Sequence, residues 1–94
     1  MPEMHVIVRW PDGTQEACYS PSLVMKDFFV PGEAYPIDDF TSRARQALTI
    51  ASERVREKYG FACSRAAATL ATIERRASGF KARPSNVTVI EFQE

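Results

Sequence analysis

Cys63 and His5 are the residues of this sequence whose chemistry could support nucleophilic catalysis. Cys63 stands at the predicted start of a helix, where unpaired N–H groups and the helix dipole lower the pKa of a thiol. Arg65 would act in the same direction. A nucleophilic cysteine also needs a base, and His5 is the only histidine of the chain. If the fold brings His5 within reach of Cys63, the two residues would form a catalytic pair. The alternative is that Cys63 is a small apolar residue in the buried stripe of a helix.

The second thiol, Cys18, lies in a polar segment with no base beside it, so we expect a partly buried structural cysteine. A disulfide with Cys63 would require an oxidising compartment. Two cysteines and one histidine, without C-x-x-C or H-x-x-x-H spacing, fall short of the four ligands of a structural zinc site. Neither a Gly-rich phosphate loop nor a hydrolase motif is present. The sequence therefore predicts no metal site and no cofactor.

The candidate binding residues are aromatic side chains and one arginine, in two groups: Arg9, Trp10 and Tyr19, and Phe28, Phe29 and Tyr35. The first group falls on neighbouring predicted strands, and Trp, Tyr and Arg are the residue types that most often dominate interfaces. The second group borders a Pro-Gly loop and could line a pocket. The alternative is structural for both: cross-strand packing for the first group and closure of the core for the second.

Strict alternation predicts the strands that position these residues. Met4, Val6, Val8 and Trp10 share one side of a segment that runs from 4 to 10. The turn residues Pro-Asp-Gly at 11–13 join it to a polar return strand at 15–20, which makes a hairpin. A last alternating strand follows at 87–92.

Helical spacing and capping residues predict three helices. Ser22 caps a short helix over 23–29. A long helix begins with Asp38 or Asp39 as its cap and ends at Gly60. The third runs from position 63 or 64 to Gly79, and its stripe of small alanines lets another helix approach closely. A short connection makes the last two helices antiparallel.

The elements follow the order β-β-α-α-α-β. This order predicts a small α+β fold: a three-stranded sheet, made of the N-terminal hairpin and the C-terminal strand, packed against a helical hairpin. The first strand should be central with the last strand beside it, and the direction of that last strand stays open. A chain of 94 residues is expected to form a single globular domain over 1–94.

Charge and composition narrow the function classes. Net charge is zero, which argues against a dedicated nucleic-acid-binding protein. Residues 1–40 hold two basic and seven acidic side chains, whereas residues 41–94 hold ten basic and five acidic ones. Either the two halves complement each other within one fold, or acidic and basic faces meet in an assembly. Without a signal peptide or a membrane-length apolar run, we expect a cytoplasmic protein with no membrane partner.

Four stretches of the sequence are similar to one family: "MPEMHVIVRWPDG", "CYSPSLV", "PGEAY" and "ALTIASERVREKYGFACSRA". The chain resembles short bacterial proteins named as nitrogen-starvation response proteins. Genes of that family typically lie in a cluster with a nitrilase, a radical SAM protein, an acetyltransferase and a flavin-dependent oxidoreductase. The resemblance implies a bacterial cytoplasmic protein made under nitrogen limitation, and it supplies no catalytic residues.

Two functions follow as hypotheses. The first is a non-catalytic accessory or binding protein of a nitrogen-starvation and nitrilase gene cluster, acting as a homo-oligomer or with an enzyme of that cluster. The second is a small enzyme or thiol carrier that uses Cys63 on a nitrile- or cyanide-derived intermediate.

Overall fold

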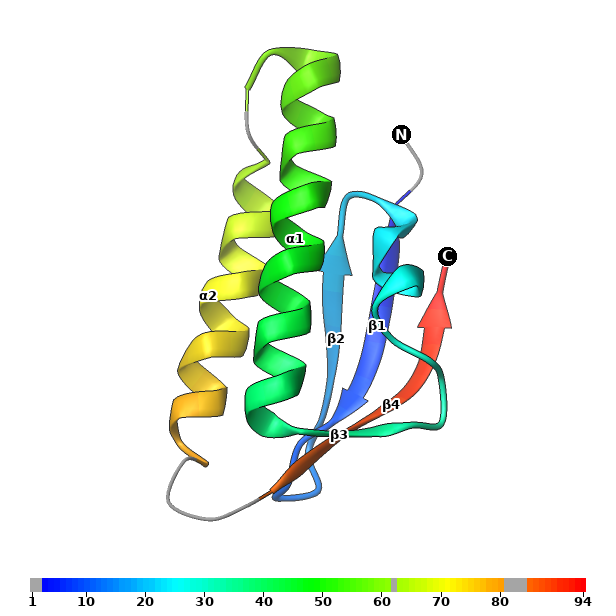
Figure 1. Cartoon of the computed structure of the whole chain (residues 1–94), viewed down its shortest axis with the longest axis vertical. Helices are drawn as coiled ribbons and strands as arrows, with labels where there is room; N and C mark the ends of the chain where they lie inside the picture. The colour runs from blue at the N-terminus through cyan, green and yellow to red at the C-terminus, as the bar shows by residue number, and fades with distance from the viewer. Residues whose placement is uncertain (1–2, 62, 81–84) are drawn as a thin grey trace.

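A four-stranded antiparallel sheet forms one layer of the molecule, and two helices cover one of its faces (Figure 1). The computed structural model describes residues 3–61, 63–80 and 85–94. The strands are β1 (Met4–Arg9), β2 (Gln15–Ser20), β3 (Ala34–Pro36) and β4 (Asn86–Gln93), in the spatial order β2-β1-β4-β3. Strand β1 is central with β4 beside it, as predicted, and β4 is antiparallel to it.

The expected three-stranded sheet is wrong by one strand, because β3 forms where the sequence predicts a loop. Gly32, with a φ of 90°, turns the chain toward β4, and its N–H donates to the carbonyl of Val89 at 2.7 Å. The N–H of Val89 donates in turn to Glu33 at 2.9 Å. Pairing with a strand about fifty positions away along the chain, and not local propensity, makes this segment extended.

The hairpin turn forms as predicted. Gly13 has a φ of 89°, and its N–H donates to the carbonyl of Trp10 at 2.8 Å. The Asp12 carboxylate accepts hydrogen bonds from the N–H and hydroxyl of Thr14, at 3.0 and 2.6 Å. The Thr14 hydrogen bonds lower the pKa of Asp12, since they favour the charged form. The turn therefore fixes the register of β1 against β2.

The predicted first helix is in fact a single 3₁₀ helix, η1 (Leu23–Asp27). Ser22 caps it, as predicted, by accepting from the N–H of Val24. The N–H groups of Phe28 and Phe29 both donate to the carbonyl of Met25, which ends the helix before Phe28. The order β-β-α-α-α-β is therefore corrected to two strands, η1, a third strand, two α-helices and a final strand.

The two long helices have nearly the predicted limits: α1 spans Ile37–Tyr59 and α2 spans Ser64–Ser78. Gly60 ends α1 in the left-handed conformation, with a φ of 83°. The expected aspartate cap is wrong, because Pro36 occupies the N-cap and the N–H of Ile37 donates to the carbonyl of Ser85. Asp38 and Asp39 instead lie in the first turn, where their negative charges interact favourably with the helix dipole.

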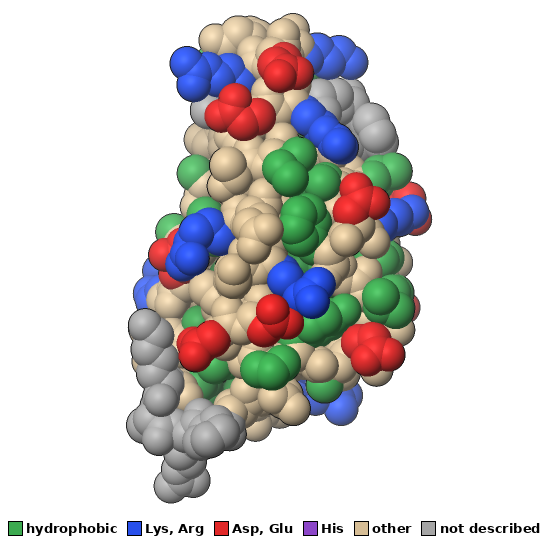
Figure 2. Space-filling view, viewed as in Figure 1, with side chains coloured by type: hydrophobic (Ala, Val, Ile, Leu, Met, Phe, Trp, Pro, Cys, Tyr) green, Lys and Arg blue, Asp and Glu red, His purple; other side chains and the backbone are tan. Residues whose placement is uncertain are grey.

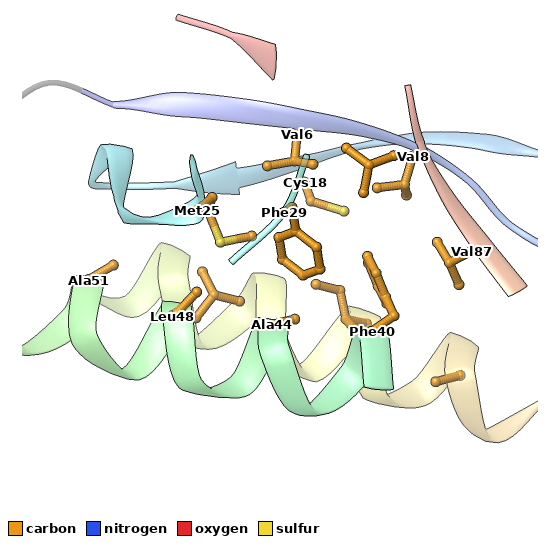
Figure 3. Packing of buried hydrophobic residues seen from close by; sticks show 14 of the residues in the cluster. Val6, Val8, Cys18, Met25, Phe29, Phe40, Ala44, Leu48, Ala51 and Val87 are labelled. Atoms are coloured by element: carbon orange, nitrogen blue, oxygen red, sulfur yellow. The ribbon is translucent and has the colours of Figure 1, made fainter. Parts of the chain in front are cut away.

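Phe40 joins the separate parts of the core. Its ring meets Trp10 edge-on at 5.7 Å between centroids and lies 5.2 Å from Phe29. Phe29 in turn meets Tyr35 edge-on at 5.3 Å. Figure 3 shows Phe40 and Phe29 between α1 and the sheet, where Val8 also points. Further along α1, the buried side chains are Leu48 and three alanines that are fully buried: Ala44, Ala47 and Ala51.

Four arginines, each eleven positions after the last, reach from the helices to other elements. Arg43 donates to the carbonyl of Phe28, and Arg54 donates to the hydroxyl of Ser22, both at 2.9 Å. Arg65 lies over the ring of Tyr19, and Arg76 pairs with Glu16 at 3.5 Å. Eleven residues are close to three helical turns, so each helix presents its two arginines on one side. Part of the charge difference between residues 1–40 and residues 41–94 is thus compensated by contacts within the fold.

The end of α1 and the start of α2 extend past the sheet (Figure 1). The molecule is accordingly elongated, with principal extents of 41, 22 and 18 Å. The end of β2 lies at this same end of the molecule, where Cys63 and Tyr19 line one pocket. The fold therefore collects residues from three elements around the helical turn.

We expect Phe40→Ala to lower the free energy of unfolding by about 3–5 kcal/mol, because the lost ring leaves a cavity between three elements. Phe40→Leu, which keeps an apolar side chain, should lose less and stay folded. Urea unfolding followed by circular dichroism measures both. Ile50→Ala, at a side chain that is 39% exposed, is the control. Equal losses for Phe40→Ala and Ile50→Ala would contradict the role of Phe40.

Candidate functional site

The candidate site is a pocket of about 190 Å³ at the end of the helical hairpin. Its walls come from the N-terminal segment, the end of β2, the last turns of α1 and the start of α2: Glu3, Tyr19, Pro21, Val55, Tyr59 and Cys63. Tyr59 in this wall is 50% exposed, and Phe61, in the turn between Tyr59 and Cys63, is 68% exposed. We call the surface formed by Tyr19, Val55, Tyr59, Phe61 and Cys63 the hairpin tip.

Tyr19 is the centre of the polar contacts at this site. The Arg65 guanidinium lies 3.7 Å from the centroid of its ring and 4.0 Å from the Glu3 carboxylate. The His5 ring meets the Tyr19 ring edge-on at 5.7 Å. Burial raises the pKa of Tyr19, and its hydrogen bond to Glu3 and the charge of Glu3 act in the same direction. The phenol therefore stays protonated and acts as a hydrogen-bond donor to Glu3.

Both candidate catalytic residues lie close to Tyr19, but they are not joined. Cys63 is half-buried at the N-cap of α2, and its side chain makes no capping hydrogen bond. His5 contacts Tyr19 from the neighbouring strand position. Within residues 3–61, 63–80 and 85–94, no hydrogen bond links the imidazole to the sulfur. The structure thus brings the two residues to one region without forming a nucleophile–base pair, and their catalytic role stays a prediction.

Cys18 belongs to the core and not to the site. Its side chain is 4% exposed, opposite Val6 on β1, and it points toward the buried cluster in Figure 3. Burial raises the pKa of this thiol from 9.0 to about 12, and the charge of Glu16 adds to the effect. The folded protein therefore keeps a proton that the unfolded chain releases. The stability that this thiol contributes is full below pH 9 and is lost as the pH rises toward 12.

The first predicted binding group is divided between the two faces of the sheet. Trp10 is 1% exposed and stacks on Phe80, and its indole N–H donates to Glu16 at 2.9 Å. Arg9 is exposed on the opposite face, and Tyr19 lines the pocket. The alternation of β1 already separates Arg9 from Trp10, so this division was present in the sequence.

The second predicted group forms a packed corner around Arg43. Phe29 is 1% exposed, while Phe28 and Tyr35 are half-buried. The Arg43 guanidinium lies 5.1 Å from the centroid of the Tyr35 ring, and the Tyr35 hydroxyl accepts from the N–H of Val30 at 2.8 Å. These contacts are those of structural packing, and the binding role of both groups remains a prediction.

Sequence reasoning missed five residues of the site region: Glu3, Pro21, Val55, Tyr59 and Phe61. For the last two a signal was available. Tyr59 is the last residue of α1 and Phe61 follows Gly60, so both side chains lie where the helix extends past the sheet (Figure 1). Two aromatic rings beside a helix-ending glycine therefore predict an exposed apolar surface.

The molecular surface carries no large region of one charge on the face shown in Figure 2, where Lys and Arg alternate with Asp and Glu. In the part of the chain that the structure describes, no three His, Cys, Asp or Glu side chains gather as metal ligands. Among the described residues, none of the helices is long and apolar enough to cross a membrane.

The family model for the nitrogen starvation-induced protein NitG matches residues 5–92. The chain belongs to this NitG family. The match includes every residue that lines the pocket except Glu3. No curated protein and no solved structure matches the chain significantly. The family description, which refers to induction by nitrogen starvation, therefore gives the biological setting and leaves the molecular activity open.

We expect iodoacetamide to modify Cys63 in the folded protein and to leave Cys18 unmodified, even above pH 9.0. Cys63 lies at a pocket wall, whereas Cys18 is buried and its pKa is about 12. Mass spectrometry of the peptides after alkylation distinguishes the two sites, and labelling in denaturant shows that both thiols can react. Modification of Cys18 at the rate of Cys63 without denaturant would contradict this assignment.

Proposed function

We propose that this chain is a non-catalytic binding protein of the nitrogen-starvation response, which recognises a protein partner through the hairpin tip. The observation that carries the proposal is the exposure of the two aromatic side chains on either side of Gly60: Phe61 at 68% and Tyr59, which lines the pocket, at 50%. Large apolar side chains that gather on a surface commonly mark an interaction site. Aromatic rings are also the residues that most often dominate binding energy.

The size of the pocket supports a protein partner over a free metabolite. Sites for drug-sized ligands commonly have volumes of about 300–1,000 Å³. The pocket at the hairpin tip, at about 190 Å³, accommodates a single side chain of a partner. Phe61 and Tyr59 would then contact the surface around that side chain. The partner that we favour is an enzyme of the nitrilase-containing gene cluster implied by the family resemblance.

We expect Phe61→Ser to weaken partner binding by about 30-fold or more, which corresponds to a hot-spot loss of about 2 kcal/mol. The protein is immobilised and exposed to extract from nitrogen-starved cells, the retained protein is identified, and its affinity is then measured by calorimetry. Val30→Ser is the matched control, since Val30 is 56% exposed away from the pocket. Equal affinities for the two variants, or retention of no specific protein, would overturn the proposal.

A second candidate function is thiol chemistry at the same pocket. It is favoured by one observation: Cys63 lines a pocket together with the phenol of Tyr19 and the carboxylate of Glu3. These groups would place a substrate carbon or sulfur beside the thiol, as expected of a carrier for a nitrile- or cyanide-derived intermediate.

The thiol hypothesis predicts that the folded protein forms a covalent adduct with a reactive nitrile, by addition of the thiol across the carbon–nitrogen bond. Cys63→Ser should abolish this adduct, whereas Cys18→Ala should retain it. Mass spectrometry of the intact protein measures the adduct. An adduct that persists in Cys63→Ser, or that does not form in the wild-type protein, would leave this function without support.

A further inference from the structure

The face of the sheet opposite the helices is built by alternate residues of three paired strands. Because Met4, Val6 and Val8 are buried beneath the helices, the intervening residues of β1 lie on the open face: His5, Ile7 and Arg9. Cross-strand partners share a face, which adds Tyr19, Ala17 and Gln15 on β2 and Glu91 and Gln93 on β4. The hydrogen bond from Gln93 to Glu91 places these two side chains together on that face.

The centre of this face is apolar. Ile7 is half-buried and lies outside the core cluster, and Ala17 stands opposite it on β2. Ile90 occupies the irregular position where the pairing of β1 with β4 shifts between Ile7 and Val8. It too is half-buried and lies outside the core cluster.

One charge of each sign lies beside this apolar centre. Arg9 is exposed near one end, next to Thr88, and Glu91 is exposed next to Ile7 on the neighbouring strand. Among the described residues, no ion pair involves either side chain, in contrast with the paired Arg43, Arg45, Arg65 and Arg76. The face thus offers a positive and a negative group at different positions around one apolar patch.

We propose that this open face binds a second copy of the chain in a two-fold symmetric dimer. In such an interface the same surface is used by both copies, so residue i contacts residue j and j contacts i. A two-fold axis lying in the interface close to Ile7 places Arg9 of each copy against Glu91 of the other, with the isoleucines in contact at the centre. This arrangement forms two symmetric Arg9–Glu91 ion pairs between the copies. It also removes the apolar centre of the face from water. Tyr19 of the hairpin tip is the cross-strand partner of His5 on this face. The other residues of the tip, which come from the helical hairpin, stay free for the proposed partner: Val55, Tyr59, Phe61 and Cys63.

Sedimentation velocity across micromolar to millimolar concentrations tests the dimer. We expect the wild-type chain to dimerise, more weakly at high salt, because the paired charges are near the rim. Arg9→Glu and Glu91→Arg should each weaken dimerisation about tenfold or more, since each reversal places like charges opposite each other at two symmetric positions. The double variant Arg9→Glu/Glu91→Arg should restore it.

Arg75→Glu is the matched control: it makes the same charge change at an exposed position of α2 and should leave the dimer intact. Ile7→Glu should remain folded by circular dichroism and be monomeric by sedimentation velocity. A wild-type monomer at all concentrations, or a double reversal that fails to restore association, would overturn the proposal. Phe61→Ser should remain dimeric, so loss of partner binding and loss of the dimer are separate outcomes.

Discussion

The fold depends on one aromatic contact set, in which Phe40 touches Trp10 and Phe29. These rings come from the end of the hairpin, the loop after η1 and the first turns of α1, so no element can bury its own ring alone. The contacts fix the beginning of α1. Because α1 has 23 residues, its other end lies about 34 Å away. That end extends past the sheet, where less of the helix is covered. Stability is thus concentrated at one end of the molecule, and exposed aromatic surface at the other.

The arginines of the helices add contacts between the helices and the rest of the fold beyond those of the small apolar core. The buried alanines of α1 and α2 allow close packing of the helices but supply little apolar area per residue. Three of the four regularly spaced arginines lie over aromatic rings: Arg43 on Tyr35, Arg65 on Tyr19 and Arg76 on Trp10. Their aliphatic stems cover apolar surface while their charges meet acidic partners in the N-terminal half. These arginines on the helices therefore connect them to the rest of the fold, and three of the four contact a residue of the sheet.

The hairpin and both long helices could be predicted because their signals are local: alternation in β1, the turn at Gly13, the helical stripe of α1 and the glycine at 60. Strand β3 could not, since three residues have no period and become a strand only by pairing with β4. The pocket was also beyond local reasoning. Glu3 and Arg65 resemble ordinary solvated charges in the sequence, and they meet only because α2 starts beside the end of β2. Cys63 was correctly placed at a helix start, but its distance from His5 is a property of the whole fold.

Strand β3 also limits how the protein can associate when it is abundant. An edge strand is a template for fibril growth when it offers a long row of free N–H and C=O groups. In this sheet that outer row is three residues long, and it ends at Pro36, which has no N–H to donate. Amyloid-like extension from this border is therefore disfavoured. The opposite border, β2, is contacted by α2, whose Arg76 reaches Thr14 and Glu16 beside it. A starving cell could thus accumulate this protein with little risk of cross-β seeding.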